Sequence, residues 1–202
     1  LSFDLLDNLS NSDILPAGTI FTWDPPISSP ENAISGGTQG SSSNIIQTLT
    51  NNTTSTATLS YVVSSSTPQG CNANTFNLNV IVNPSAQTDQ ISNQVVCNGD
   101  TTNTILFTTQ NTGGVTSYNW TNNTPSIGLS SSGDGDISSF TATNLLTEPV
   151  VATIVVTPAF EFDGIVCDGE AKTFTITVNP TAQVNQPSDQ VVCNGEDVSV
   201  LF

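Results

Sequence analysis

One segment of the chain occurs twice, and this internal repeat limits the possible folds more than any other feature of the sequence. Residues 83–99 read NPSAQTDQISNQVVCNG, and residues 179–195 read NPTAQVNQPSDQVVCNG. The copies are 96 positions apart, and the same register aligns Cys71 with Cys167. A period of this length indicates copies of one small domain arranged along the chain, each in contact mainly with its neighbours.

Apolar residues alternate with polar ones in each copy, which predicts half-buried β-strands. Asn, Gly, Ser and Pro interrupt the runs, and no stretch keeps a helical period, so short strands joined by turns predict an all-β sandwich with seven or more strands in each complete repeat. The alternating residues are Ala57, Leu59, Tyr61, Val63, Phe76, Leu78, Val80 and Val82 in the first copy, and Ala152, Ile154, Val156, Phe174, Ile176 and Val178 in the second.

Two Asn-Pro pairs mark the boundaries of the repeats, because proline ends strand pairing and stiffens the residues that follow. Asn83-Pro84 and Asn179-Pro180 each come directly after an alternating strand. We therefore divide the chain into a repeat over residues 1–82 that lacks its first strand, a complete repeat over 85–179, and the first strands of a third repeat over 183–202. The short proline-marked joints predict an elongated rod.

Aromatic pairs occupy matching positions of the two copies. Phe21 and Trp23 correspond to Tyr118 and Trp120. Since a tryptophan buries a large apolar area, we expect each Trp to fill the space between the two sheets of its sandwich. We also expect Ile154, Val156, Phe174 and Ile176 to point inward.

The charge of the chain excludes several classes of function. It has 17 acidic residues against one basic residue, no His, and a formal net charge of −16. Nucleic acid needs clustered cations, and catalysis near neutral pH usually needs a group that titrates there or a cation that holds developing negative charge. We therefore predict no enzyme activity, no nucleic-acid partner and no membrane insertion. The charge fits a soluble extracellular polymer.

Acidic residues in the loops are the candidates for calcium ligands, because loop carboxylates often bind calcium in extracellular sandwiches. None of these residues follows an EF-hand spacing, and the first copy has no counterpart of Asp134 and Asp136. We interpret them as solvated turn residues and predict no metal and no cofactor. They are Asp134, Asp136, Glu161, Asp163, Asp168 and Glu170.

The four cysteines lie at repeat-equivalent positions, which indicates a disulfide framework in an oxidising compartment. A bond between Cys97 and Cys167 would keep each repeat self-contained, and this is the pairing that we predict. In a simple sandwich, however, the end of the first strand and the loop before the last strand lie at opposite ends. Bonds between consecutive repeats and free thiols therefore remain as alternatives.

Four segments resemble the PKD-like, immunoglobulin-like repeats of giant surface proteins of the Bacteroidota. They are VVCNGE, YNWTNNTPSIGLSSSGDGDISSFTATN, VVATIVVTP and CDGEAKTFTITVNP. The resemblance covers the second repeat almost completely and the first more loosely, from about Phe21 to Pro84. It implies tandem sandwich repeats, export by type IX secretion, display on the outer cell surface, and a filament that the gliding machinery carries along the cell.

The resemblance also implies surface glycosylation. Asp100-Thr101-Thr102 is similar to the acceptor sequence for O-glycosylation in that phylum, so Thr101 is the predicted acceptor. Asn-x-Ser/Thr sequences also occur, as expected by chance in a chain so rich in Asn and Thr. They start at Asn8, Asn51, Asn52, Asn119 and Asn122.

Two separate functions fit these observations, and a third, a calcium-stiffened adhesion domain, overlaps the first of them. The first is a stalk repeat of a secreted adhesin that attaches gliding cells to surfaces, with neighbouring repeats, the secretion and gliding machinery, and external surfaces or polysaccharides as partners. The second is a spacer or carbohydrate-binding accessory module of a secreted polysaccharide-degrading enzyme. A carbohydrate-binding module should show a row of exposed aromatic residues, which distinguishes the two.

Overall fold

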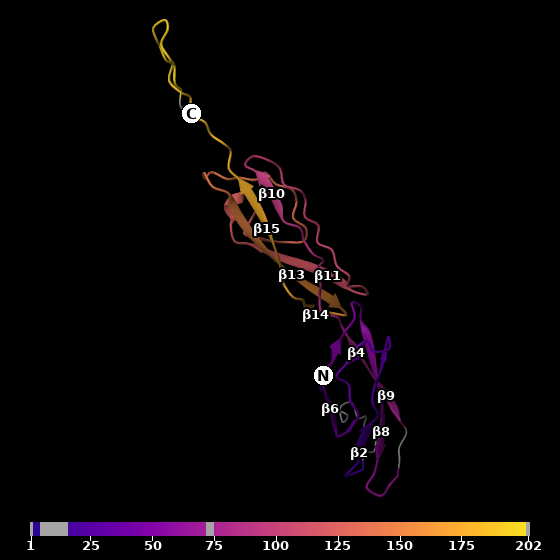
Figure 1. Ribbon diagram of the computed structural model, residues 1–202. Coiled ribbons are helices and arrows are strands. Elements are labelled where there is room, and N and C mark those ends of the chain that lie inside the picture. The colour runs from indigo at the N-terminus through magenta and orange to yellow at the C-terminus, as the bar shows by residue number, and fades with distance from the viewer. Residues whose placement is uncertain (1, 5–15, 72–74, 201–202) are drawn as a thin grey trace.

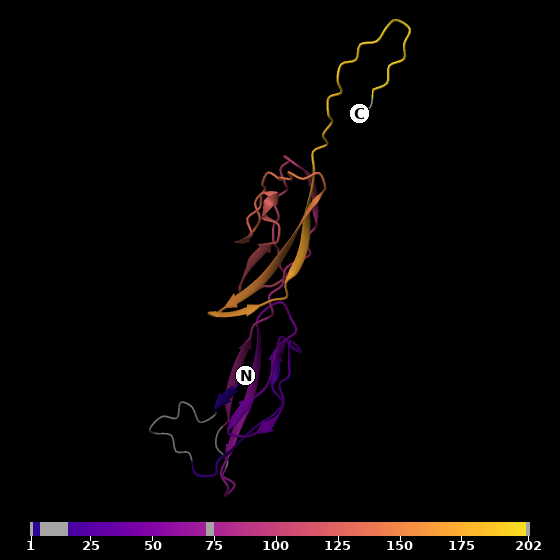
Figure 2. The same cartoon turned by 90° about the vertical axis from the view of Figure 1, so that its left-hand side faces the viewer.

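The computed structural model describes residues 2–4, 16–71 and 75–200, and it shows two β-sandwiches that follow one another along one axis (Figure 1). The same end-to-end arrangement is seen after a quarter turn (Figure 2). The protein is all-β, with tandem immunoglobulin-like sandwich repeats in an elongated molecule. In the part of the chain that is described, no helix has the length and apolar character needed to cross a membrane.

The first sandwich contains one larger sheet and two short ribbons. The larger sheet has the order β3-β8-β2-β5, with β9 on β8, while β1 pairs with β6 and β4 with β7. Its strands are β1 (Ser2–Asp4), β2 (Ile20–Trp23), β3 (Ile27–Ser29), β4 (Ile34–Ser35), β5 (Gly40–Ser41), β6 (Asn44–Ile46), β7 (Thr50–Asn51), β8 (Ala57–Ser66) and β9 (Phe76–Val82).

The second sandwich is built on a six-stranded sheet with the order β10-β15-β13-β11-β12, and β14 pairs with β13. All its pairs are antiparallel except that of β10 with β15, which is parallel. The elements are β10 (Gln94–Cys97), β11 (Val115–Asn122), the 3₁₀ turn η1 (Pro125–Ile127), β12 (Ser132–Asp134), β13 (Val150–Phe162), β14 (Ile165–Asp168) and β15 (Lys172–Asn179).

The second layer of this sandwich is irregular, so the prediction of seven or more strands was wrong. In place of strand ladders, its segments meet at isolated bridges, Thr101 with Thr141 and Ile105 with Ile137, and through single backbone hydrogen bonds such as that from the Gly99 N–H to the Ala142 carbonyl. Side chains bond backbone groups that a strand would otherwise pair: the Phe107 N–H donates to Asp136 Oδ1. Short polar side chains compete with strand pairing in this way, and this layer is rich in them.

The predicted core residues of the second repeat are buried, which confirms that prediction. Trp120 and Phe174 are 7% and 2% exposed, and Ile154, Val156 and Ile176 are fully buried. Apolar side chains from the irregular layer close the core from the other side; they include Ile105, Phe107, Ile127, Leu129, Ile137 and Ala142.

Each buried tryptophan lies against a glycine on the neighbouring strand. Trp23 is opposite Gly40 and Trp120 is opposite Gly133. A Cβ atom on Gly133 would lie 2.3 Å from Trp120 Cζ2, so a larger residue there has no room. The indole N–H of Trp120 donates to the Gly135 carbonyl, and that of Trp23 donates to the Thr38 carbonyl. The two copies therefore hold the ring in the same way.

The last strands of the two sandwiches differ in burial. Phe174, Ile176 and Val178 on β15 are buried, whereas their counterparts Leu78, Val80 and Val82 on β9 are only half-buried. Strand β15 is covered along its outer edge by β10, but the described residues place no strand along the outer edge of β9. The opening strand of a repeat is therefore what completes burial of its closing strand.

Residues 180–200 extend away from the second sandwich, and side chains 181–200 are all exposed (Figure 1). The predicted opening strand of the third repeat forms only a turn here, where the Glu196 N–H donates to the Cys193 carbonyl. Its counterpart β10 obtains its strand geometry by pairing with β15, which comes at the end of the same repeat.

Candidate functional site

The linker between the sandwiches is built into their contact surface, and we call the residues around it the joint. Within the linker, Pro84, Ala86 and Thr88 are buried, while Ser85 and Gln87 are exposed. The chain passes so close to Gly169 that a Cβ atom on this residue would lie 2.0 Å from the Ala86 carbonyl oxygen. Because alternate linker residues are packed, this linker is a fixed structural element.

Asn111 is the polar centre of the joint. Its side chain is 9% exposed, and its Nδ2 group donates to the carbonyls of Thr54 and Ser85, both at 3.2 Å. Its Oδ1 accepts the N–H of Gln87 at 2.7 Å and the hydroxyl of Thr109 at 3.0 Å. One buried amide thus connects the first sandwich, the linker and the second sandwich.

Backbone contacts add to this connection. The Thr112 N–H donates to the Thr54 carbonyl at 2.9 Å, and Thr112 forms an isolated parallel bridge with Ser55. On the other side of the joint, Asn83 Nδ2 donates to the carbonyls of Phe162 and Ile165, both at 3.4 Å. Contacts on two sides restrict both bending and twisting.

Asp89 fixes the far end of the linker. Its backbone N–H donates to the Thr108 carbonyl, and its carboxylate accepts hydrogen bonds from Thr108 Oγ1 and Gln110 Nε2. These side-chain hydrogen bonds hold the pKa of Asp89 below its ordinary value. Because the pKa of Asp89 is lower in the folded chain than in the unfolded chain, its ionised carboxylate stabilises the fold at pH values above the unfolded pKa. This stabilisation is lost as the pH falls through the folded pKa.

A pair of asparagines forms the same corner in both sandwiches. Asn51 Nδ2 donates to the carbonyls of Ser55 and Val82, and its Oδ1 accepts the N–H of Thr53. Asn144 makes the same three bonds to its own neighbours, including one to the Val178 carbonyl. Each asparagine ties a loop to the end of the closing strand, directly before the joint.

The predicted disulfide partners lie at opposite ends of the second sandwich. Cys97 is beside Asn179 at the end of β15, and Val150 of β13 pairs with Val178 at this same end. Cys167 is opposite Phe160, which is ten positions further along β13 than Val150. At about 3.3 Å per residue, roughly 30 Å separates them along the sheet. The structure does not bring Cys97 and Cys167 together, and all four cysteines are free thiols in it.

The predicted glycosylation acceptor Thr101 is exposed on the loop after β10. Among the Asn-x-Ser/Thr sequences, Asn52 and Asn119 are exposed, but Asn122 is buried and its amide nitrogen donates to the Leu129 and Ser130 carbonyls. Asn51 uses its amide in the corner described above, and Asn8 lies outside the described residues. The modification of Thr101 stays a prediction.

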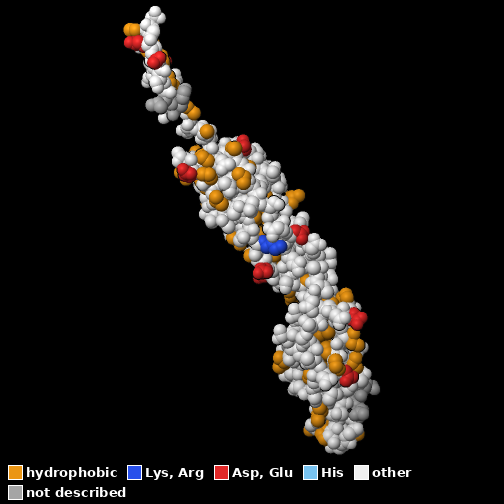
Figure 3. Space-filling view, viewed as in Figure 1, with side chains coloured by type: hydrophobic (Ala, Val, Ile, Leu, Met, Phe, Trp, Pro, Cys, Tyr) orange, Lys and Arg blue, Asp and Glu red, His pale blue; other side chains and the backbone are white. Residues whose placement is uncertain are grey.

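The acidic candidates are all exposed, but only Asp136, Asp163 and Glu170 lie outside strands. Asp134 ends β12, Glu161 is on β13 and Asp168 ends β14. Asp136 already accepts the Phe107 N–H, so its carboxylate has a structural role in the second layer. The described residues contain no group of three or more His, Cys, Asp or Glu that could hold a metal ion. Figure 3 shows acidic side chains spread along the face that it presents.

Calcium is expected to change the thermal stability of the chain very little. A ligand that binds only the folded state must raise the melting temperature by mass action, so a bound calcium ion would be visible. The measurement is thermal melting by circular dichroism with millimolar calcium, with magnesium as the control, and with a chelator. A calcium-specific rise of about ten degrees would show that the loop acids bind the ion.

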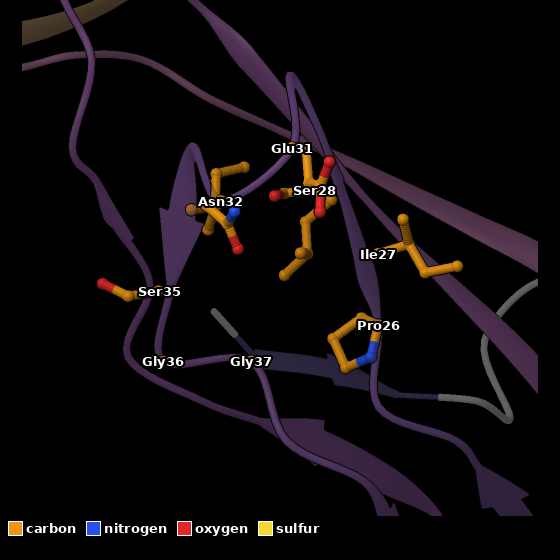
Figure 4. Close-up of a pocket in the computed structure, with 10 residues that line it drawn as sticks. Pro26, Ile27, Ser28, Glu31, Asn32, Ser35, Gly36 and Gly37 are labelled. Atoms are coloured by element: carbon orange, nitrogen blue, oxygen red, sulfur yellow. The ribbon is translucent and has the colours of Figure 1, made fainter.

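A shallow pocket of about 250 Å³ opens on the first sandwich (Figure 4). Pro26, Ile27, Glu31 and Asn32 contribute to its wall. Glu31 is the only titratable side chain that lines it. A single carboxylate does not provide the acid and base pair that glycoside hydrolysis requires.

A comparison with known protein families found a match in the first sandwich. The model of the PKD-like domain family matches residues 2–86, which span the first sandwich and the beginning of the linker. This match and the observed sheets support a PKD-like or immunoglobulin-like repeat, a class of structural or accessory module. A search of curated proteins found no match to the chain. The match lies in the first repeat, although the sequence resemblance was stronger in the second.

Proposed function

We propose that the chain is a force-bearing stalk segment of a secreted cell-surface adhesin, and that it has no catalytic activity of its own. The observation that carries this proposal is the joint: a packed linker with Asn111 at its centre fixes one repeat on the end of the next. A repeat that only separates two domains needs no such fixed contact, whereas a stalk must keep its length and direction.

The more specific proposal follows from the sequence resemblance. We propose export by type IX secretion, display on the outer cell surface, and a role in attachment during gliding, as in the gliding-motility adhesin SprB. The strongly acidic surface supports this because a net charge of −16 keeps long chains soluble and apart from one another. The partners would be neighbouring repeats, the gliding machinery and the surface to which the cell attaches.

The accessory-module alternative has less support. Carbohydrate-binding surfaces present rows of exposed aromatic rings. In the described part of the chain, Phe76 is the one aromatic residue whose side chain is exposed. The tryptophans and tyrosines are all buried in the two cores. We therefore expect the purified chain to remain in solution when it is mixed with insoluble polysaccharides.

The proposal is tested on cells that produce the parent protein. An antibody against residues 85–179 is expected to label intact cells, and mild external protease should remove this label without lysis. Replacing residues 84–179 by the corresponding residues of another repeat should preserve attachment and gliding, whereas loss of the whole protein should abolish both. Labelling that requires permeabilised cells, or firm binding of the chain to polysaccharide, would contradict the proposal.

A further inference from the structure

The joint contains a cavity that includes a cysteine. The cavity has a volume of about 410 Å³, and Cys167 lines it together with Asn83, Val82 and Leu49 of the first sandwich. Cys167 is partly buried there. The cysteine before the closing strand of one repeat therefore lies against the end of the preceding repeat.

The correspondence between the repeats indicates what kind of residue lies beside Asn83 when the preceding repeat has its opening strand. Asn83 and Asn179 are counterparts, since each begins the repeated segment NPSAQ or NPTAQ. Beside Asn179, the position on the outer edge of the closing strand is occupied by Cys97, which is exposed. The corresponding position beside Asn83 is on the outer edge of β9, next to the cavity that Cys167 lines.

We infer that disulfides cross the joints, and that each links the cysteine at the end of one repeat's opening strand to the cysteine before the closing strand of the next repeat. A residue paired beside Asn83 would lie about 4.8 Å from it, at the wall of the cavity that Cys167 also lines, and a disulfide across this cavity requires a Cα separation of about 4.4–6.8 Å. By the same rule Cys97 bonds the counterpart of Cys167 in the repeat that follows Asn179.

Two further observations agree with this pairing. The cysteines of one sandwich lie roughly 30 Å apart along the sheet, as estimated from the rise per strand residue, which excludes a bond within that sandwich without unfolding it. The turn after Cys97 is also held at the joint, because the Asn98 N–H donates to the Asn179 carbonyl and its Nδ2 donates to Thr181 Oγ1. Cys97 is therefore fixed at the end of the repeat.

The reaction is thiol–disulfide exchange. The two thiols lose two protons and two electrons and form one S–S bond, while a small-molecule or protein disulfide accepts the electrons and becomes two thiols. The inference rests on the proposed function only in requiring an oxidising compartment in the cell. By this rule the partner of Cys97 belongs to the repeat after Asn179, and the partner of Cys167 belongs to the opening strand of the repeat before it. Cys97 and Cys167 do not bond each other in the structure.

The test uses the chain lengthened by a second copy of residues 84–179, inserted directly after Asn179. All cysteines are replaced by serine except two, in two matched variants. The first variant keeps Cys97 of the first copy and Cys167 of the second copy. The second variant keeps Cys97 and Cys167 of the same copy. Both are incubated under native conditions with oxidised glutathione.

Thiol titration and the intact mass then report the bond. The first variant is expected to lose both titratable thiols and two hydrogen atoms while remaining a monomer. In the second variant each cysteine is expected to stay a thiol or to carry one glutathione, which the intact mass shows as an added group. A bond between the two cysteines of the second variant, or no bond between those of the first, would overturn the inference. Because the protein is purified, this result does not depend on where the parent protein is located.

Discussion

Replacing Trp120 with alanine is expected to lower the free energy of unfolding of the second sandwich by about 3–5 kcal/mol. The ring is 7% exposed, packs in the main core cluster and donates its N–H to the Gly135 carbonyl. Alanine would leave a large cavity and an unpaired carbonyl, and the neighbouring Gly133 has no side chain that could fill the space. Urea denaturation of the whole chain, monitored by far-ultraviolet circular dichroism, measures the decrease in the free energy of unfolding.

Val115→Ala provides the matched control for this experiment. Val115 lies on the same strand, β11, but is 70% exposed, so its truncation should change stability by less than about 0.5 kcal/mol. The transition of the first sandwich should keep its midpoint in both variants. A loss below about 1 kcal/mol for Trp120→Ala would mean that the indole ring does not fill the core.

The second large effect is expected at the joint. Asn111→Ala removes the amide that bonds Thr54, Ser85 and Gln87. The Thr54 carbonyl keeps its bond from Thr112, but the Ser85 carbonyl and the Gln87 N–H lose this partner, at a cost of about 1–3 kcal/mol for each group that water does not reach. The sandwiches should then bend relative to one another. Small-angle X-ray scattering should show an extended rod with a narrow distance distribution for the natural chain, and a shorter, broader distribution for the variant.

Asn103→Ala controls for the loss of an asparagine, because Asn103 is an exposed residue of the same sandwich. It should leave both the scattering curve and the melting temperature unchanged. If the natural chain scatters as a compact particle with the sandwiches side by side, the stalk geometry is wrong. An unchanged rod in Asn111→Ala would show instead that the contacts of Thr112 and Asn83 hold the joint without this amide.

The sequence predicted the features that depend on a regular pattern. Alternating residues identified β8, β13 and β15, and the repeat register placed Trp23 and Trp120 in equivalent cores. The pattern failed for the second layer of the second sandwich, where Asp136 and other polar side chains bond the backbone in place of a neighbouring strand. Such local competition has no period, so alternation cannot show it.

The joint was harder to predict for a different reason. Asn111 is one of many asparagines, and its role depends on the meeting of three segments that are far apart in the sequence. Asn51 and Asn144 could have been found, because each begins a turn at a similar place in its repeat. For Cys97 and Cys167, a general rule of sandwich geometry already indicated opposite ends, and the register of β10 and β14 shows them there.

The parallel pairing of β10 with β15 has a mechanical consequence. Tension enters a repeat at the start of β10 and leaves at the end of β15, so it pulls these neighbouring strands past one another along their length. The hydrogen bonds between the four paired positions, Gln94–Ile176 to Cys97–Asn179, then share the load and must break together. In an antiparallel pair of end strands the bonds would open one after another. The second repeat therefore resists shearing at the place where a pulled chain would otherwise begin to unfold.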